Sequence, residues 1–217
     1  MMLLYAVVPA DATVPETRGL VGHRLETIRG ALAAVIVEEC SDRLRATTDE
    51  SGAFAKIICD LATRTLMLPI RFPTLLTTTS VVLAELQANQ AAWRERLSEL
   101  DGLSEVVIRA QWAQPDRDLG LASDSSGTTY LVNRASAIHR REASVAEITD
   151  LVRSCAREIK VLHSQRGVRI ACLVGNADVP KLRDAVLSWR QAGGHRQVVV
   201  GGPWPPFSFV DQEAVGA

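Results

Sequence analysis

Short apolar runs recur along the whole chain, and they limit its possible folds more than any other feature. None approaches the roughly 20 consecutive apolar residues of a membrane-spanning helix. Runs of this length between polar and helix-forming stretches are typical of strands buried in a sheet. Together with one weakly alternating segment at Leu25–Arg29, the expected strands are Met1–Val8, Ala31–Val37, Leu66–Pro73, Val106–Trp112, Val168–Val174 and Gln197–Gly201.

The clearest helix is expected from about Ser80 to Leu100. Its apolar residues are separated by four, seven, four and three positions, which places them on one helical face. They are Val82, Leu86, Trp93, Leu97 and Leu100. Upstream, Thr48 or Asp49 is expected to cap a helix that ends near Thr63.

A long helical stretch is expected from Gly127 to about Leu162, with an interruption near Ser144. Ser144 followed by Glu147 resembles a capping box. The apolar stripe of this stretch contains Val145, Ile148, Leu151, Val152, Cys155, Ile159 and Leu162. A last helix is expected at Pro180–Ala192, because proline suits a first helical turn.

The polar stretch from Gln114 to Gly127 predicts a domain boundary. It contains a proline, glycines, serines and charged residues, which are typical of a linker. The order of elements is then βββαβαβ before the boundary and αβαβ after it. An α+β protein with domains at residues 1–114 and 125–217 is therefore expected.

Composition excludes several classes of protein. The 24 Lys and Arg residues against 25 Asp and Glu give a net charge of −1, which argues against a nucleic-acid binder. Met1–Val8 is too short for a signal peptide and lacks a basic start, so a cytoplasmic protein is expected. The cysteines form no C-x-x-C pair and lie in apolar surroundings, so they are expected to be buried and reduced: Cys40, Cys59, Cys155 and Cys172.

No residue pattern predicts catalysis, a metal site or a cofactor. The four histidines lack the spacing of metal ligands, and no G-x-S-x-G motif occurs. Gly175 to Asp178 lies between a strand and a helix, where a phosphate can bind, although a plain turn capped by Asp178 is the other interpretation. Glu38 to Asp42 places carboxylates beside a thiol, which disfavours a thiolate and predicts a solvated loop.

The most unusual segment is Gly201–Phe209. Three prolines within four positions restrict its backbone and lower the entropy lost when it becomes ordered. Its aromatic side chains are suited either to docking in a partner's groove or to packing on their own domain. The motif contains Gly202, Pro203, Trp204, Pro205, Pro206, Phe207 and Phe209.

Four segments resemble the gas vesicle protein GvpL/GvpF family over nearly the whole chain. They are Tyr5–Pro9, Leu68–Thr74, Gly127–Leu131 and the ending Gly202–Phe209. The sequence departs from the family pattern at Pro73, where glycine is usual, and at Phe207, where tyrosine is frequent.

The resemblance implies an accessory or minor structural protein of gas vesicle formation in the cytoplasm. It implies a ferredoxin-like N-terminal sheet with helices, a smaller and modified ferredoxin-like C-terminal domain, and binding to the hydrophobic major shell protein. Other accessory gas vesicle proteins are further expected partners, whereas nucleic acid and membrane are not. An enzyme that uses the Gly175 turn and an unrelated protein-interaction module remain the alternatives.

The residues themselves suggest one mode of binding. Prolines bound the segment Leu66–Phe72, as they do in edge strands, and an edge strand can pair with a strand of a partner. Arg71 is expected to pair with a partner carboxylate or within its own domain. The expected contact residues are Leu68, Ile70, Arg71 and Phe72.

Overall fold

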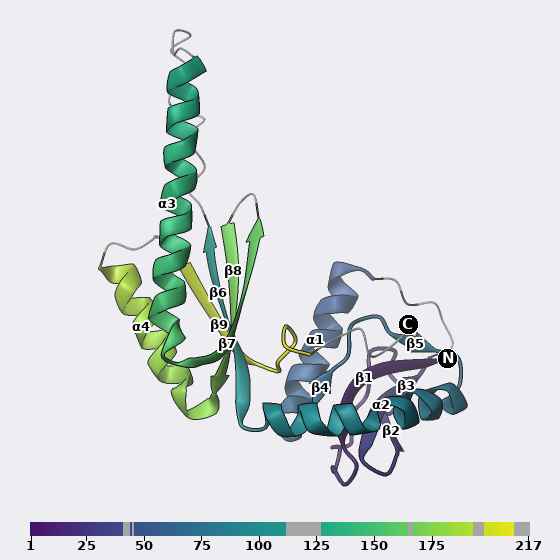
Figure 1. Cartoon of the computed structure of the whole chain (residues 1–217). Coiled ribbons are helices and arrows are strands. Elements are labelled where there is room, and N and C mark those ends of the chain that lie inside the picture. The colour runs from purple at the N-terminus through teal and green to yellow at the C-terminus, as the bar shows by residue number, and fades with distance from the viewer. Residues whose placement is uncertain (41–43, 45, 112–126, 165–166, 193–197, 211–217) are drawn as a thin grey trace. The chain divides into compact units, whose positions relative to one another are not determined.

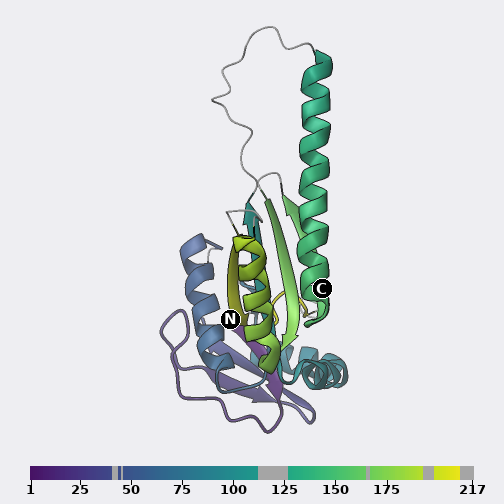
Figure 2. The same cartoon turned by 90° about the vertical axis from the view of Figure 1, so that its left-hand side faces the viewer.

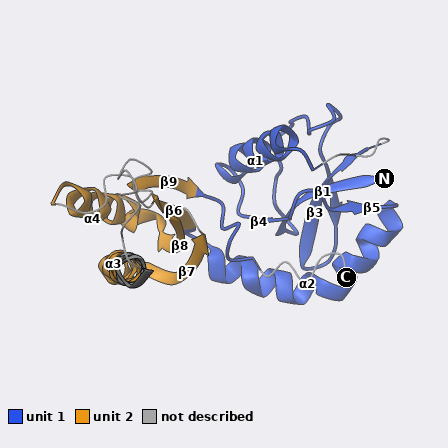
Figure 3. Ribbon diagram, turned by 90° about the horizontal axis from the view of Figure 1, so that it is seen from above, with its two compact units in different colours: residues 1–103, 204–217 blue, residues 104–203 orange. Residues whose placement is uncertain are grey.

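The structure is a computed structural model that describes residues 1–40, 44, 46–111, 127–164, 167–192 and 198–210 (Figure 1). The chain divides into two compact units (Figure 3). Unit 1 contains residues 1–103 together with 204–217, and unit 2 contains residues 104–203. The chain therefore completes unit 2 before it returns to unit 1. The predicted α+β class is confirmed, and each unit contains one antiparallel sheet.

Unit 1 is built on an antiparallel sheet in the order β2-β3-β1-β4, with β5 pairing to β1 beside β4. Residues 10–25, which separate the first two strands, contain no helix, so unit 1 lacks the βαββαβ order of the ferredoxin-like N-terminal domain that the resemblance implied. The elements of unit 1 are β1 (Met2–Pro9), β2 (Glu26–Arg29), β3 (Ala33–Glu39), α1 (Thr48–Ala62), β4 (Leu68–Pro69), β5 (Leu75–Leu76) and α2 (Thr79–Leu100).

Both faces of this sheet are covered. Successive strand residues point to opposite faces, and β1 and β3 are buried along nearly their whole length. Figure 3 shows α1 and α2 on opposite sides of the sheet. On the α1 side, Phe54, Ile58 and Leu61 pack against Leu3, Tyr5, Ala34 and Ile36. On the other side α2 packs against β1, β2 and β3 with the five buried residues that its periodicity predicted.

Unit 2 follows the βαββαβ order of a ferredoxin-like fold, with strands arranged β7-β8-β6-β9. Its elements are β6 (Leu103–Gln111), α3 (Gly127–Arg153), β7 (Ala156–Ser164), β8 (Gly167–Gly175), a 3₁₀ turn at Asn176–Asp178, α4 (Val179–Gln191) and β9 (Val198–Trp204). Figures 1 and 2 show α3 and α4 on the same face of this sheet.

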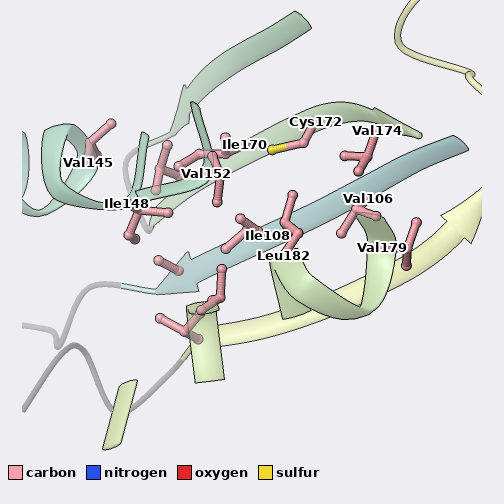
Figure 4. Close-up of a cluster of buried hydrophobic side chains, with 14 residues drawn as sticks. Val106, Ile108, Val145, Ile148, Val152, Ile170, Cys172, Val174, Val179 and Leu182 are labelled. Atoms are coloured by element: carbon pink, nitrogen blue, oxygen red, sulfur yellow. The ribbon is translucent and has the colours of Figure 1, made fainter. Parts of the chain in front are cut away.

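The core of unit 2 lies between that face and the two helices (Figure 4). Alternate residues of β6 and β8 point into it, and α3 and α4 each contribute residues three or four positions apart. The core includes Val106, Ile108, Val145, Ile148, Val152, Ile170, Cys172, Val174, Val179 and Leu182.

The predicted helix from Gly127 to Leu162 is wrong in its last part. The helix ends at Arg153, a turn follows, and Ala156–Ser164 forms strand β7. Ile159 fits a helical stripe, but it is equally compatible with a strand in which Ile159 and Val161 point to the core. Pairing with β8, which local sequence does not reveal, decides between the two.

Both predicted capping sites are also corrected. Ser144 lies inside α3, where its hydroxyl donates to the carbonyl of Arg140 at 2.9 Å. The cap of α1 is Thr47, not Thr48 or Asp49. Its hydroxyl oxygen accepts a hydrogen bond from the Glu50 amide at 3.2 Å, and the Glu50 carboxylate reaches back to Thr47, which completes a capping box.

The two units do not divide where the polar stretch predicted. Most of the stretch from Gln114 to Gly127 lies outside the described residues. The units separate instead at residues 103/104 and 203/204, so that nearly all of β6 belongs to unit 2. The sequence predicted the order αβαβ for the second domain. Because β6 belongs to unit 2 and Ala156–Ser164 forms strand β7, the observed order is βαββαβ.

Candidate partner-binding surface

The segment predicted to bind a partner lies at the edge of the unit 1 sheet, but most of its side chains point inward. Leu68 and Ile70 are buried in their own unit. Phe72 is half-buried, and its ring lies 4.9 Å from that of Phe54 in α1. Only Arg71 is exposed.

The backbone of this edge offers fewer hydrogen bonds than a strand partner needs. The amide of Ile70 donates to the carbonyl of Tyr5 at 2.8 Å, and Pro69 is the register partner of Ala6. Because hydrogen bonding alternates along an antiparallel strand, the backbone of Pro69 faces away from β1. Proline has no N–H to donate there, so the edge is protected against strand addition at this position.

A second surface of unit 1 is distinguished by its lack of charge. The outward face of α2 presents Val81, Ala84, Ala88 and Ala91, which follow helical spacing. Val81 and the flanking Leu83 are 38% and 37% exposed. Leu75 and Leu76 of β5, which contacts α2, are half-buried nearby. We call Val81, Ala84, Ala88 and Ala91 the uncharged α2 face; Leu83 lies on a different side of the helix.

Surface helices ordinarily carry charged side chains on their outward face. The outward faces of α1 and α4 do so, with Asp49 and Lys56 on one and Lys181 and Asp184 on the other. From Thr79 to Trp93, by contrast, α2 has a single charged residue, Glu85, which is half-buried beside Asn89. The uncharged α2 face therefore differs from the outward faces of α1 and α4 in carrying no charged side chain.

The C-terminal motif packs on unit 1 rather than on the domain that precedes it. Phe209 is completely buried, Pro205 and Pro206 are buried, and Phe207 packs against the α1 side of the core. The Arg96 guanidinium of α2 donates through Nε to the Phe209 carbonyl at 3.2 Å, and Nη2 contacts the same oxygen. The expectation that this segment packs on its own C-terminal domain is therefore wrong, because residues 204–210 pack in unit 1.

The first residues of the motif belong to β9. The carbonyl of Gly202 accepts a hydrogen bond from the Arg183 guanidinium of α4. Arg190, two helical turns further along α4, donates to the carbonyl of Val198 at 3.4 Å. Trp204 is 43% exposed, and the peptide bond between Gly202 and Pro203 is cis. The arginines of α4 thus cover carbonyls along the outer edge of the unit 2 sheet.

A buried carboxylate, which the sequence placed in a solvated loop, organises the other end of unit 1. Glu38 is fully buried in β3. It accepts hydrogen bonds from the Tyr5 hydroxyl at 2.6 Å, from the His23 amide at 2.9 Å and from the Val21 amide at 3.2 Å. The Tyr5 oxygen in turn accepts from the Leu20 amide at 2.7 Å. The loop after β1 is therefore hydrogen-bonded to side chains of both β1 and β3. Residues 41–43 of the predicted solvated loop lie outside the described residues.

The turn after Gly175 is hydrogen-bonded to another segment of the same unit. Asn176 Oδ1 accepts a hydrogen bond from the Ser104 hydroxyl at 2.5 Å. Asp178 precedes α4 but makes no side-chain capping bond, so its predicted capping role is not observed. Pro180 stands in the first turn of α4 as predicted.

One cavity of about 370 Å³ lies between residues 15–17 and the C-terminal half of α1. Its wall combines Glu16 and Asp60 with Arg64 and with aliphatic side chains. Within the described ranges, no group of three or more His, Cys, Asp or Glu side chains is arranged to hold a metal ion. A search of the same ranges finds no helix that is long and apolar enough to span a membrane.

The four cysteines form two groups that differ in burial. Cys40 and Cys172 are buried, whereas Cys59 and Cys155 are half-buried, so complete burial was predicted correctly for only two. Burial raises the pKa of Cys172 to about 12, and the nearby Glu105 charge adds to the shift. Burial also raises the pKa of Cys59, with a further contribution from Asp60.

We expect iodoacetamide to label the native protein in the order of this burial. Cys155 is expected to react first, Cys59 more slowly because its thiolate is disfavoured, and Cys40 and Cys172 only on unfolding. Mass spectrometry of peptides from a labelling time course measures the four rates, with urea-denatured protein as the control. Equal rates for all four thiols in the native protein would contradict this packing.

Three comparisons agree on what this chain is similar to. The family model for "Gas vesicle synthesis protein GvpL/GvpF" matches residues 1–211. Gas vesicle protein F of Streptomyces sp. (strain CB03234) is 28% identical over 225 residues, covering 92% of this chain and 94% of the relative.

Two crystal structures have a similar fold. Gas vesicle protein GvpF from Microcystis aeruginosa matches with a TM-score of 0.79 and 16% identity, covering 96% of this chain and 98% of that one. GvpF from Anabaena sp. PCC7120 matches with a TM-score of 0.80 and 17% identity, covering 96% and 94%.

Proposed function

The chain belongs to the gas vesicle synthesis protein GvpL/GvpF family, and we propose that it binds the hydrophobic major shell protein during gas vesicle assembly. In this proposal it is a non-enzymatic adaptor or chaperone of the cytoplasm and the gas vesicle. Other accessory gas vesicle proteins are further partners. A shell subunit that exposes apolar surface before assembly tends to aggregate, and a partner that covers this surface prevents it.

The uncharged α2 face is the observation that carries the proposal. An apolar partner segment that packs on α2 desolvates no charge, whereas on α1 or α4 it would bury charged side chains at a cost of several kcal/mol. The alanines also permit close approach of a partner helix, because the distance between packed helix axes, about 8–10 Å, is shortest where the contacting side chains are small. Val81 supplies the larger apolar contact.

The residues predicted from the edge strand have different roles in this proposal. Arg71, which is exposed, pairs with a partner carboxylate at the rim of the interface. Leu68 and Ile70 act indirectly through their burial, and the half-buried Phe72 acts through its ring contact with Phe54 of α1; both contacts hold this segment on the sheet. The C-terminal motif stabilises the same unit from within.

Replacing Ala88 by Glu is expected to weaken binding of the shell protein at least tenfold, because the new carboxylate must be buried in the interface. Arg71→Ala is expected to weaken it only about two- to threefold, as is usual for a rim charge. Co-purification and titration of the full chain with shell protein held soluble by a fusion partner measure both effects.

Ala53→Glu is the matched control. Ala53 is an exposed alanine on α1, so the same substitution adds the same charge to the same unit and leaves binding unchanged. Equal binding by Ala88→Glu and wild type would exclude α2 as the surface. Failure of the wild-type chain to bind would exclude the partner.

A further inference from the structure

The two edge strands of the unit 2 sheet, β9 and β7, differ in the contacts made by their backbone groups. At one edge, arginines of α4 contact the carbonyls of Val198 and Gly202 in β9. At the other edge lies β7, a nine-residue strand for which β8 is the neighbour in the sheet order. Long edge strands are templates for pairing with another chain.

The register of β7 on β8 identifies the backbone groups that face outward. Ser164 pairs with Gly167 across a two-residue connection, and such a closing pair is hydrogen-bonded. Hydrogen bonding alternates from there, so Ser164, Leu162, Lys160 and Glu158 direct their backbone groups to β8. The N–H and C=O groups of His163, Val161 and Ile159 consequently point to the outer side.

A β-bulge limits the regular part of this edge. The register shifts between Ala156 and Glu158, which leaves Glu158–Ser164 as the unbroken span. Val161 is the central residue of these seven, and it faces outward.

The side chains next to this edge include an apolar one in an exposed position. Leu162 is 53% exposed, and it shares with Glu158 and Lys160 the sheet face opposite the core. Glu158 and Lys160 are half-buried, and Lys160 Nζ lies 3.8 Å from Glu158 Oε1. A second strand laid along β7 covers Leu162.

We propose that β7 pairs with β7 of a second copy of this chain, antiparallel and symmetric about Val161. In this register Ile159 and His163 exchange hydrogen bonds with His163 and Ile159 of the other copy, and Val161 pairs with itself. All three outward-facing residues are then used. This proposal concerns unit 2 and is independent of shell-protein binding by unit 1.

Side-chain complementarity favours a second copy as the occupant. The register places Leu162 opposite Lys160 of the other copy, twice, so that each leucine packs on an aliphatic lysine stem. Glu158 lies opposite Ser164, and no like charges face each other. A register centred on Ile159 instead requires the bulge at Arg157 to pair, which bulges disfavour.

Because seven residues per chain make a small interface, we expect a reversible dimer with a dissociation constant of tens of micromolar or weaker. Sedimentation velocity of the full chain from roughly 5 to 500 µM is expected to show a monomer–dimer equilibrium. Wild type that remains monomeric over the whole range would overturn the proposal.

Charge substitutions at Leu162 test the register. Leu162→Lys places two like-charge pairs against Lys160 and is expected to weaken the dimer more than tenfold. Leu162→Glu places opposite charges there and is expected to retain or strengthen it. The double variant Lys160→Glu with Leu162→Lys restores attraction and is expected to recover the dimer.

Val199→Lys is the control on the opposite edge. Val199 is a 63% exposed strand residue of β9, and its substitution is expected to leave dimerisation unchanged. Thermal melts of each variant establish that the fold is intact. Equal dissociation constants for the lysine and glutamate variants of Leu162 would exclude this pairing, as would dissociation by Val199→Lys.

Discussion

Replacing Glu38 by Ala is expected to lower the free energy of unfolding by about 3–5 kcal/mol, which is the usual effect of removing one partner from a buried ionic or hydrogen-bonded set. The substitution leaves the Tyr5 hydroxyl and the amides of Val21 and His23 without their acceptor. It also releases the loop after β1 from the sheet. Urea denaturation followed by circular dichroism measures the loss.

Gly19 provides a sharp control for this network. A β-carbon at Gly19 would lie 2.2 Å from Glu38 Oε2, so Gly19→Ala alone is expected to be destabilising. In the Glu38→Ala background the obstructing atoms are absent, and Gly19→Ala is expected to cost much less. A double-mutant cycle measures this coupling. Additive effects would show that Glu38 does not occupy the space beside Gly19.

Tyr5 gives the network a characteristic pH dependence. Burial, followed by the hydrogen bond to Glu38, raises the pKa of Tyr5 above its ordinary value of 10.0. The folded state therefore retains a proton that the unfolded chain loses above about pH 10. The contribution of Tyr5 to stability is constant below pH 10 and declines above it. Tyr5→Phe is expected to make the decline in unfolding free energy above about pH 10 less steep, with the contribution of Cys172 remaining. Urea denaturation of both proteins between pH 8 and pH 11 measures the difference, and identical slopes would contradict it.

Ending the chain after Pro203 is expected to destabilise unit 1 by 5 kcal/mol or more. The truncation removes the completely buried Phe209 and the carbonyl that Arg96 contacts. Phe209→Ala alone is expected to cost about 3–5 kcal/mol through lost burial and the cavity it leaves. Trp204→Ala, at a 43% exposed position of the same segment, is expected to cost less than about 1 kcal/mol.

Hydrogen exchange distinguishes which unit the segment supports. In the truncated chain, amides of β1, β3 and α2 are expected to lose protection, whereas those of β8 and α4 retain it. Loss confined to β8 and α4 would mean that the segment stabilises unit 2, as a contiguous C-terminal domain would require. Unchanged protection in both units would refute a packing role.

The candidate binding surface was only partly predictable. The prolines around Leu68 predicted an edge strand over Leu66–Pro73; β4 is the last strand of its sheet path, but it contains only Leu68–Pro69. Local sequence did not reveal that Leu68 and Ile70 point into the core or that Pro69 faces outward, because both depend on register with β1. The uncharged α2 face was readable in principle, since the residues between the buried positions of that helix are also uncharged.

Local residue patterns were sufficient to predict several helices and strands. The apolar spacing of α2 and the continuous apolar runs of β1, β3 and β8 specify one secondary structure each, because their residues bury the same face or both faces wherever the element packs. The family resemblance followed from short motifs in the same way. Pro180 marked the start of α4 because proline needs no hydrogen-bond partner there.

Other features depend on contacts between segments that are far apart in the chain. Ile159 is a strand residue because β8 lies beside it, and Glu38 is buried because Tyr5, which is 33 residues away, donates to it. Phe209 belongs to unit 1 because Arg96, 113 residues earlier, lies where the chain returns. Each of these three features is stabilised by a contact with a distant segment, and no local residue pattern encodes such a contact.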